Sequence, residues 1–180
     1  NGANVVIAGR NKKSIEEALL ALGAKARAIC ADATDADTSP RAIELCQESF
    51  GSFDGLYHVA GGSGRKMGDG PLHEITLEGW NKTLELNLTS LMLSNQAAIK
   101  HFLQHNKGGS ILNMGSVLGY SPSPRHFATH AYAAAKSAII GFSKSIAAYY
   151  ASNNIRINII APALVETPMA QRAANDTTMQ

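Results

Sequence analysis

Short apolar segments rich in β-branched residues alternate along this chain with much longer segments of helical periodicity. Because helix-length segments separate them, successive strands are expected to run parallel, with right-handed crossovers. The alternation therefore predicts an α/β fold, with a parallel sheet covered by helices on both faces. The predicted strands, each about five residues long, are Val5–Ala8, Ala26–Cys30, Leu56–Val59, Ser110–Met114 and Ile155–Ile160.

Two helices are predicted in the first third of the chain. The first begins at Ser14, where Glu17 completes a capping-box spacing, and it ends at Gly23. The second has Pro40 in its first turn, a position that tolerates proline, and it runs to Phe50.

The third and fourth predicted helices are longer and more apolar. Thr76 is expected to cap the third helix, whose apolar residues keep helical spacing until Gly108 and Gly109 end it. The fourth helix runs from about Ala131 to Ala151 and is apolar on most faces. This pattern favours burial within the subunit or in an interface between subunits.

Two long loops, over residues 60–74 and 117–130, each follow a predicted strand. Ligands of open parallel sheets bind outside the carboxyl ends of the strands. Both loops are therefore expected to rim the binding crevice.

Composition narrows the class of protein further. The 180 residues fit one domain, residues 1–180, without repeats or a linker. Sixteen basic and 14 acidic residues give a net charge of +2, too small and too scattered to favour nucleic acid or a membrane surface as partner. No apolar run reaches the roughly 18 residues that span a bilayer. Cys30 and Cys46 lie among apolar neighbours and are expected to be buried free thiols, which suits the cytoplasm.

Tyr132 and Lys136 are four residues apart at the start of the fourth predicted helix, so they share one helix face. An ammonium group near a phenol favours the phenolate and lowers the pKa of the tyrosine. Such a pair can perform acid–base chemistry near neutral pH.

Two more polar residues are candidates for the same site. Ser116 follows the fourth predicted strand, and Asn87 stands between apolar residues of the third helix. Each candidate also has an ordinary interpretation. Ser116 can be a turn serine, and Asn87 can be an amide on a solvated helix face. The spacing of Tyr132 and Lys136 can arise by chance. The residues taken one by one leave these alternatives open.

Taken together, these residues resemble the short-chain dehydrogenase/reductase family, and the resemblance covers essentially the whole chain. Ser116, Tyr132 and Lys136 match the family's catalytic Ser/Tyr-x-x-x-Lys set, and Asn87 matches the asparagine that completes its tetrad. The resemblance implies a single-domain, Rossmann-like, doubly wound parallel sheet. Other segments similar to family motifs are Asp32-Ala33, Ala60-Gly61 and residues 154–168, which include Pro162, Val165 and Thr167.

The resemblance also implies a role for each catalytic residue in an oxidoreductase that uses a nicotinamide cofactor. Tyr132 exchanges a proton with the carbonyl or alcohol oxygen, and Ser116 donates a hydrogen bond to that oxygen. Lys136 lowers the pKa of Tyr132 and holds the nicotinamide ribose. Asn87 positions a water molecule that links Lys136 to solvent.

The cofactor residues implied by the resemblance include two of these catalytic groups. Asp32 and Ala33 lie beside the adenine in this reading, and Tyr132 and Lys136 lie at the nicotinamide end. The others are Ala60, Gly61, Pro162, Val165 and Thr167.

Arg10 favours NADP over NAD. NAD-binding chains of this kind carry an acidic residue at the end of the second family strand, where it binds the ribose 2′-hydroxyl. Here that place is Gly9, followed by Arg10, whose guanidinium suits a 2′-phosphate. A solvated basic turn is the alternative.

Three features depart from the family pattern. His58 and Val59 replace two asparagines before Ala60, and His58 is interpreted as a strand-end histidine with a backbone contact rather than as a catalytic one. Ala163 replaces a glycine near the nicotinamide. The loop before Tyr132 is long, and its histidines are interpreted as pocket walls rather than metal ligands, so no metal is expected.

The family's Gly-rich first strand and turn, and its last strand, have no counterpart in this sequence. The chain is therefore expected to be an incomplete sheet from a longer protein, with a gap between the strands Val5–Ala8 and Leu56–Val59.

The functional prediction is an NADP(H)-dependent oxidoreductase acting on a small carbonyl compound or secondary alcohol. The parent protein is expected to form a homodimer or homotetramer through the third and fourth helices. The alternatives are a non-catalytic Rossmann-like scaffold and an inactive fragment of such an enzyme.

Overall fold

The computed structural model describes residues 2–124 and 127–165, and all five predicted strands are present in it. Two of them match the predicted bounds, and the other three differ from them by one residue at one end or at both ends. The strands are β1 (Val5–Gly9), β2 (Ala26–Cys30), β3 (Gly55–His58), β4 (Gly109–Met114) and β5 (Ile155–Ile160).

The predicted helices are also present, and the third is divided into three parts. They are α1 (Lys12–Leu22), α2 (Thr38–Phe50), α3 (Leu77–Leu84), a π-helical turn (Glu85–Thr89), α4 (Ser90–Gln104) and α5 (His130–Tyr150). Two short 3₁₀ turns matter below: η2 (Arg65–Met67) and η4 (Val117–Gly119).

Two helix boundaries differ from the sequence prediction. The first helix begins earlier than Ser14, because Asn11 is its N-cap and the Asn11 side chain accepts a hydrogen bond from the Ser14 amide at 3.0 Å. The third helix ends at Gln104, before Gly108 and Gly109. The prediction that Thr76 caps this helix is confirmed, because its hydroxyl accepts from the Gly79 amide at 2.9 Å.

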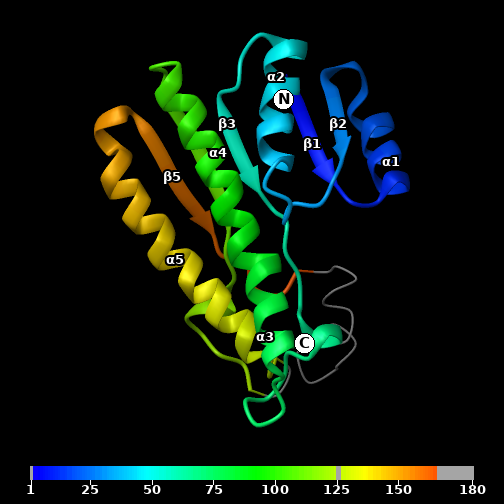
Figure 1. The fold of residues 1–180 in the computed structure, drawn as a ribbon, viewed down its shortest axis with the longest axis vertical. Helices are drawn as coiled ribbons and strands as arrows, with labels where there is room; N and C mark the ends of the chain where they lie inside the picture. The colour runs from blue at the N-terminus through cyan, green and yellow to red at the C-terminus, as the bar shows by residue number, and fades with distance from the viewer. Residues whose placement is uncertain (1, 125–126, 166–180) are drawn as a thin grey trace.

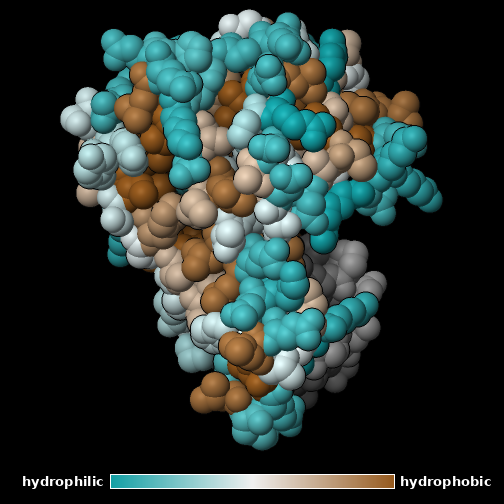
Figure 2. Space-filling model, viewed as in Figure 1, coloured by the Kyte–Doolittle hydropathy of each residue, from teal (hydrophilic) through white to brown (hydrophobic). Residues whose placement is uncertain are grey.

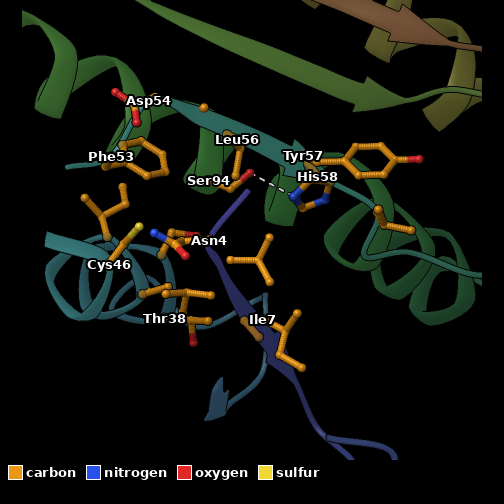
Figure 3. A pocket seen from close by; sticks show the side chains of 18 of the residues that line it. Asn4, Ile7, Thr38, Cys46, Phe53, Asp54, Leu56, Tyr57, His58 and Ser94 are labelled. Atoms are coloured by element: carbon orange, nitrogen blue, oxygen red, sulfur yellow. Dashed lines mark hydrogen bonds between the residues drawn. The ribbon is translucent and has the colours of Figure 1, made fainter. Parts of the chain in front are cut away.

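The strands form two parallel sheets rather than one. β1 pairs with β2, starting at Val5 opposite Ala26, and a second sheet has the order β3–β4–β5. The expected gap between β1 and β3 is present (Figure 1), and a cavity of about 720 Å³ lies there. Figure 3 shows Ile7 of β1 on one side of it and Leu56, His58 and Ser94 on the other.

The hydrophobic core lies on one face of the three-stranded sheet. There Phe102 of α4 packs with Ile111 of β4, and both side chains are almost completely buried. Figure 1 shows α4 and α5 in front of this sheet. The rest of the buried cluster is Ile43, Phe53, Ala98, Ile99, Ile155 and Ile157.

The prediction of strands buried on both faces is wrong for β3 and β5 within the described residues. Burial alternates along β5, where Ile155 and Ile157 are buried while Arg156 and Ile160 are exposed. Tyr57 of β3 is exposed too. A period of two means that these strands are covered on one face only.

The prediction of buried thiols is wrong for Cys30 and holds only in part for Cys46. Cys30 ends the edge strand β2 and is exposed, while Cys46 is half-buried against the Ser52 carbonyl. Both cysteines are free.

Candidate active site

Chain segments that follow three neighbouring strands meet around one pocket of about 610 Å³. Ser116 follows β4, and Tyr132 and Lys136 lie in the first two turns of α5. Gly61 and Gly62 line the pocket after β3, and Pro162 to Val165 line it after β5. The parallel strands carry these residues to one edge of the sheet, as the sequence predicts.

Lys136 is held firmly inside this pocket. Its side chain is buried, and its Nζ donates a hydrogen bond of 2.8 Å to the Met114 carbonyl at the end of β4. The same nitrogen lies 5.5 Å from the centre of the Tyr132 ring. Burial lowers the pKa of Lys136 to about 8, since the charged form loses solvation.

Ser116 and Tyr132 line the same pocket, and their side chains interact. The Ser116 oxygen also accepts from the Leu118 amide at 3.2 Å, which leaves its own proton free to donate. Burial raises the pKa of Tyr132, and the contact with Ser116 opposes this effect. The predicted lowering of this pKa is therefore not seen, because loss of solvation outweighs the favourable interactions around the phenol.

Asn87 lies in the π-helical turn and is completely buried. Its Oδ1 accepts from the Gly62 amide at 3.0 Å, and its Nδ2 donates to the carbonyls of Gly62 and Thr83, each at 2.9 Å. The solvated-face alternative for this residue is excluded. Its side chain fastens the loop that follows β3 to the helix.

Gly61 lies close to both Asn87 and Lys136. Its φ of +155° is strained for other residues, and a Cβ there would lie 2.7 Å from Asn87 Oδ1 and 3.7 Å from Lys136 Nζ. A side chain at this position would clash with the Asn87 amide and touch Lys136, so the backbone can approach Asn87 this closely only because residue 61 is glycine.

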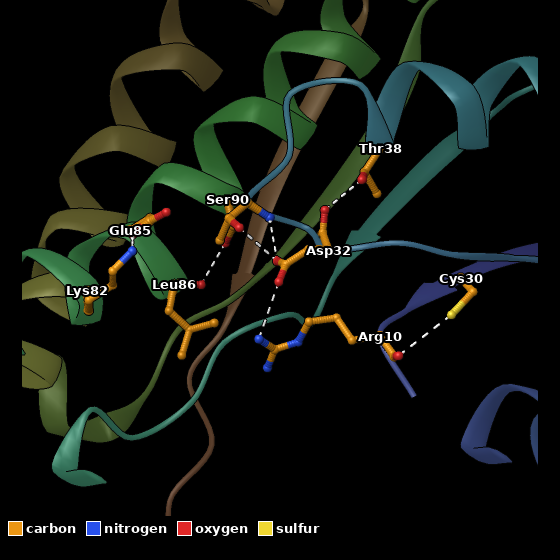
Figure 4. Close-up of polar contacts among 9 residues, drawn as sticks. Arg10, Cys30, Asp32, Thr38, Lys82, Glu85, Leu86 and Ser90 are labelled. Atoms are coloured by element: carbon orange, nitrogen blue, oxygen red, sulfur yellow. Dashed lines mark hydrogen bonds and ion pairs between the residues drawn. The ribbon is translucent and has the colours of Figure 1, made fainter. Parts of the chain in front are cut away.

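Arg10 and Asp32 form an ion pair at the carboxyl ends of β1 and β2, with 3.3 Å between Arg10 Nη1 and Asp32 Oδ2 (Figure 4). Asp32 Oδ1 accepts from the Thr34 amide at 2.9 Å and from the Thr34 hydroxyl at 2.8 Å. The bond from the Thr34 amide is the main cause that lowers the pKa of Asp32, and Arg10 adds to it. The guanidinium stays exposed to solvent.

The remaining predicted cofactor residues fall into three groups. Pro162 and Val165 line the pocket of Tyr132. Ala33 and Ala60 line the cavity between β1 and β3 instead. Thr167 lies outside the described residues.

His58 makes the backbone contact that the sequence reading favoured, with Ala60. Its Nδ1 is also 2.8 Å from the Ser94 hydroxyl (Figure 3), and its Nε2 is 3.4 Å from the Ser90 hydroxyl. Burial lowers the pKa of His58 to about 4. The ring is therefore neutral near pH 7 and links β3 to α4.

Sequence reasoning missed Asp69. This buried carboxylate lies in the loop after β3 and accepts hydrogen bonds from the Ala131 and Tyr132 amides, each at 2.9 Å. The only signal in the sequence is an aspartate between Gly68 and Gly70, which equally suits a solvated turn. Its partners are 62 and 63 residues away, beyond the reach of any local pattern.

Two features are absent from the part of the chain that the structure describes. No group of three or more His, Cys, Asp or Glu side chains is placed to hold a metal ion. No helix there is long and apolar enough to cross a membrane.

The chain is similar to known dehydrogenases over most of its length. The family model described as short chain dehydrogenase matches residues 1–178. A 2,5-dichloro-2,5-cyclohexadiene-1,4-diol dehydrogenase of Sphingobium indicum is 31% identical over 176 residues, which are 98% of this chain and 68% of the relative.

Two solved structures have a similar fold. A short chain dehydrogenase from Bacillus anthracis matches with a TM-score of 0.82 and 29% identity, over 92% of this chain and 65% of the other. A variant of ElxO with NADPH bound also matches with a TM-score of 0.82, at 25% identity, over 97% of this chain and 70% of the other. The chain thus spans about two thirds of the length of these proteins.

Proposed function

This chain belongs to the short-chain dehydrogenase family, and from that premise we propose that it catalyses hydride transfer between NADP(H) and a small carbonyl compound or secondary alcohol. The observation that carries the proposal is the convergence of Ser116, Tyr132 and Lys136 on one pocket. Ser116 and Tyr132 bring a hydroxyl and a phenol to the same pocket, as proton transfer to a carbonyl oxygen requires.

The bound nicotinamide supplies or accepts the hydride. Tyr132 gives its phenolic proton to the carbonyl oxygen during reduction and takes the proton back during oxidation. Ser116 donates a hydrogen bond to the same oxygen, where negative charge develops. A charged Lys136 favours the phenolate of Tyr132 after the proton has left.

Lys136 and the helical turn around Asn87 are proposed to provide the route for a replacement proton. Both lie next to Gly61, and the Asn87 side chain is fully used in holding Gly62 and Thr83. In this proposal the helix around Asn87 and the Lys136 ammonium hold a water molecule that passes protons from solvent to Tyr132. The pKa of about 8 for Lys136 lets that amine exchange protons near neutral pH.

The pocket fits a nicotinamide cofactor. Gly61 leaves backbone exposed where a side chain would clash, and the pocket of about 610 Å³ also includes Lys136, Pro162 and Val165. Lys136 would hold the nicotinamide ribose, and Val165 with Thr167 would hold the carboxamide. Ala60, Asp32 and Ala33 would lie along the adenosine half.

The preference for NADP rests on Arg10. Its exposed guanidinium can pair with a 2′-phosphate, and Asp32 holds it in place from the neighbouring strand. The NADPH bound to the similar ElxO structure supports this choice. NAD has no phosphate to pair with Arg10 and would bind less well.

The substrate proposed is a small cyclic alcohol or ketone. The pocket offers apolar side chains such as Phe127 and Leu164 beside the reactive Tyr132, and no carboxylate lines it in the described residues. The relative from Sphingobium indicum acts, by its name, on a cyclic diol. A ring with one hydroxyl or carbonyl group matches such a lining.

The test follows hydride transfer directly. The full-length gene product is incubated with cyclohexanone and NADPH deuterated at the transferred position, and in the reverse direction with cyclohexane-1,4-diol and NADP. Deuterium on the carbinol carbon supports the proposal. A protein that binds NADPH but transfers no deuterium to any ring ketone tried would favour the alternative, a non-catalytic scaffold or inactive fragment.

A further inference from the structure

We propose that Asp69 is a positioning residue that sets the place of Tyr132 in the active site, and this rests on the function proposed above. The carboxylate accepts two main-chain hydrogen bonds at the N-terminus of α5, one of them from Tyr132 itself. Asp69 is only 5% exposed, so neither bond competes much with water.

The first three backbone amides of α5 all donate hydrogen bonds to the loop around Asp69. The His130 amide donates to the Gly70 carbonyl at 3.2 Å, the Ala131 amide to Asp69 Oδ1 and the Tyr132 amide to Asp69 Oδ2. The N-cap residue Thr129 makes no side-chain cap bond of its own. An ordinary local cap is therefore replaced by a carboxylate from a distant loop.

The loop is built so that Asp69 cannot move freely. The Asp69 amide donates to the Gly64 carbonyl at 3.1 Å, and the Thr76 amide donates to the Gly68 carbonyl at 3.2 Å. Gly68 has a φ of +100°, and a Cβ there would lie 2.5 Å from Thr76 Oγ1, so only glycine lets the loop lie this close to α3. The carboxylate is thus anchored to the start of α3.

The other end of the same loop is held by Asn87, a residue of the candidate active site. Gly62 is held by Asn87, and the chain from Gly62 to Asp69 then returns to the amide of Tyr132. The loop therefore braces the π-helical turn against the first turn of α5. A shift of Asp69 would move Tyr132 relative to Ser116, which stands on a different element.

Electrostatics adds to the geometry. The N-terminus of a helix carries a partial positive charge, and a carboxylate there is stabilising. Two oxygens that accept from two successive amides also fix the direction of the first turn, which one acceptor would not do.

The experiment compares Asp69→Asn, Asp69→Ala and Asp54→Ala in the full-length gene product. Asn keeps the shape and one acceptor, and Ala removes both acceptors. Asp54 is the matched control. Its carboxylate also has two partners, Ser52 at 2.8 Å and Lys107 at 2.7 Å, but it lies just before β3, away from α5. Turnover of cyclohexane-1,4-diol with NADP, NADPH affinity, thermal midpoint and amide exchange of residues 129–134 are measured.

We expect kcat to fall about 10²-fold in Asp69→Ala, because misplacement of a catalytic group by about 1 Å costs that much. Asp69→Asn should fall between Asp69→Ala and the unmodified protein. NADPH affinity and KM should change by less than about threefold, since misplacement of Tyr132 acts on the chemical step. Relative to the unmodified protein, amide exchange at residues 129–134 should be faster in both Asp69 variants. It should be unchanged in Asp54→Ala.

The outcomes separate this inference from the proposed function. Unchanged exchange in both Asp69 variants, or faster exchange with unchanged kcat, overturns the positioning role while the proposed function stands. If Asp69→Ala does not fold, Asp69→Asn decides alone. If the unmodified protein turns over no probe, the proposed function fails and takes the catalytic role of Asp69 with it, while exchange still shows whether the cap exists.

Discussion

Burial and the neighbouring Ser116 act in opposite directions on the pKa of Tyr132. Burial raises its pKa, and the Ser116 contact works against that rise. A phenol held in this way keeps its proton until a reacting oxygen takes it, which is what a general acid requires.

Replacement of Tyr132 by Phe removes the proton donor and leaves the ring in place. We expect kcat to fall by about 10²–10⁴-fold, the usual contribution of general acid catalysis. NADPH affinity, measured by fluorescence titration, should hardly change. A variant that retains most of its carbonyl-reducing activity would show that another group supplies the proton.

In the proposed function, cofactor choice depends on Arg10. We expect Arg10→Ala to reduce kcat/KM for NADPH by about tenfold, the lower range for loss of a charge-assisted hydrogen bond, and to leave kcat/KM for NADH nearly the same. Lys13→Ala is a suitable control, because Lys13 is an exposed cation near the same strand end that pairs with Glu17. An unchanged ratio of the two cofactors would contradict the NADP assignment.

Among the elements, β3 and α4 are joined by a buried histidine. His58 lies between the Ser90 and Ser94 hydroxyls, and its pKa falls from 6.5 to about 4 because burial disfavours the imidazolium. Above pH 6.5 the ring is neutral in both the folded and the unfolded chain. Below that pH the unfolded chain binds a proton that the folded chain does not, so folding stability is lost as pH falls.

We therefore predict an acid-sensitive contribution from His58 between about pH 6.5 and pH 4. The loss should reach about 3 kcal/mol at the lower end of this range. His58→Asn should flatten the dependence of unfolding free energy on pH, as measured by urea denaturation. His73→Asn, a change at an exposed histidine, should leave it as it is; equal slopes in all three proteins would refute the assignment.

At the scale of the whole molecule, the gap between β1 and β3 is the main weakness of residues 1–180. The two strands belong to separate sheets, and a cavity of about 720 Å³ lies between them. Each unsatisfied buried backbone group costs about 1–3 kcal/mol, against a total stability of about 5–15 kcal/mol for a domain. We propose that one further parallel strand fills this gap in the complete sheet.

Residues 1–180 expressed alone should consequently aggregate or bind a hydrophobic dye such as ANS, and should bind NADPH far more weakly than the full-length gene product. Size-exclusion chromatography, dye fluorescence and calorimetry would measure this. Tight NADPH binding by monodisperse protein of these residues would contradict the proposed role of the gap.

Self-association through the long helices is the second prediction at this scale. Leu103 at the end of α4 and Tyr149 at the end of α5 are exposed, and Figure 2 shows apolar patches separated by polar residues on one face. We expect the full-length gene product to form a homodimer or homotetramer, since symmetric helix patches commonly close such interfaces. Light scattering that gives a monomer at micromolar concentration would contradict this.

The sequence by itself determined most of the elements and the residues proposed as the catalytic group. Strands such as Ile155–Ile160 and the capped helix after Thr76 follow from local periodicity and local hydrogen bonds, which neighbouring residues set. Tyr132 and Lys136 were placed on one face of a helix because four residues make about one turn. Their meeting with Ser116 followed from parallel strands that end at one edge.

Only the tertiary structure decided what depends on residues far apart in the chain. It divided the strands into two sheets, left one face of β5 exposed, and gave Tyr132 a raised pKa through burial. It also brought Asp69 to the amide of Tyr132, 63 residues away. Burial and long-range hydrogen bonds arise from packing of the whole chain, and no pattern of neighbouring residues encodes them.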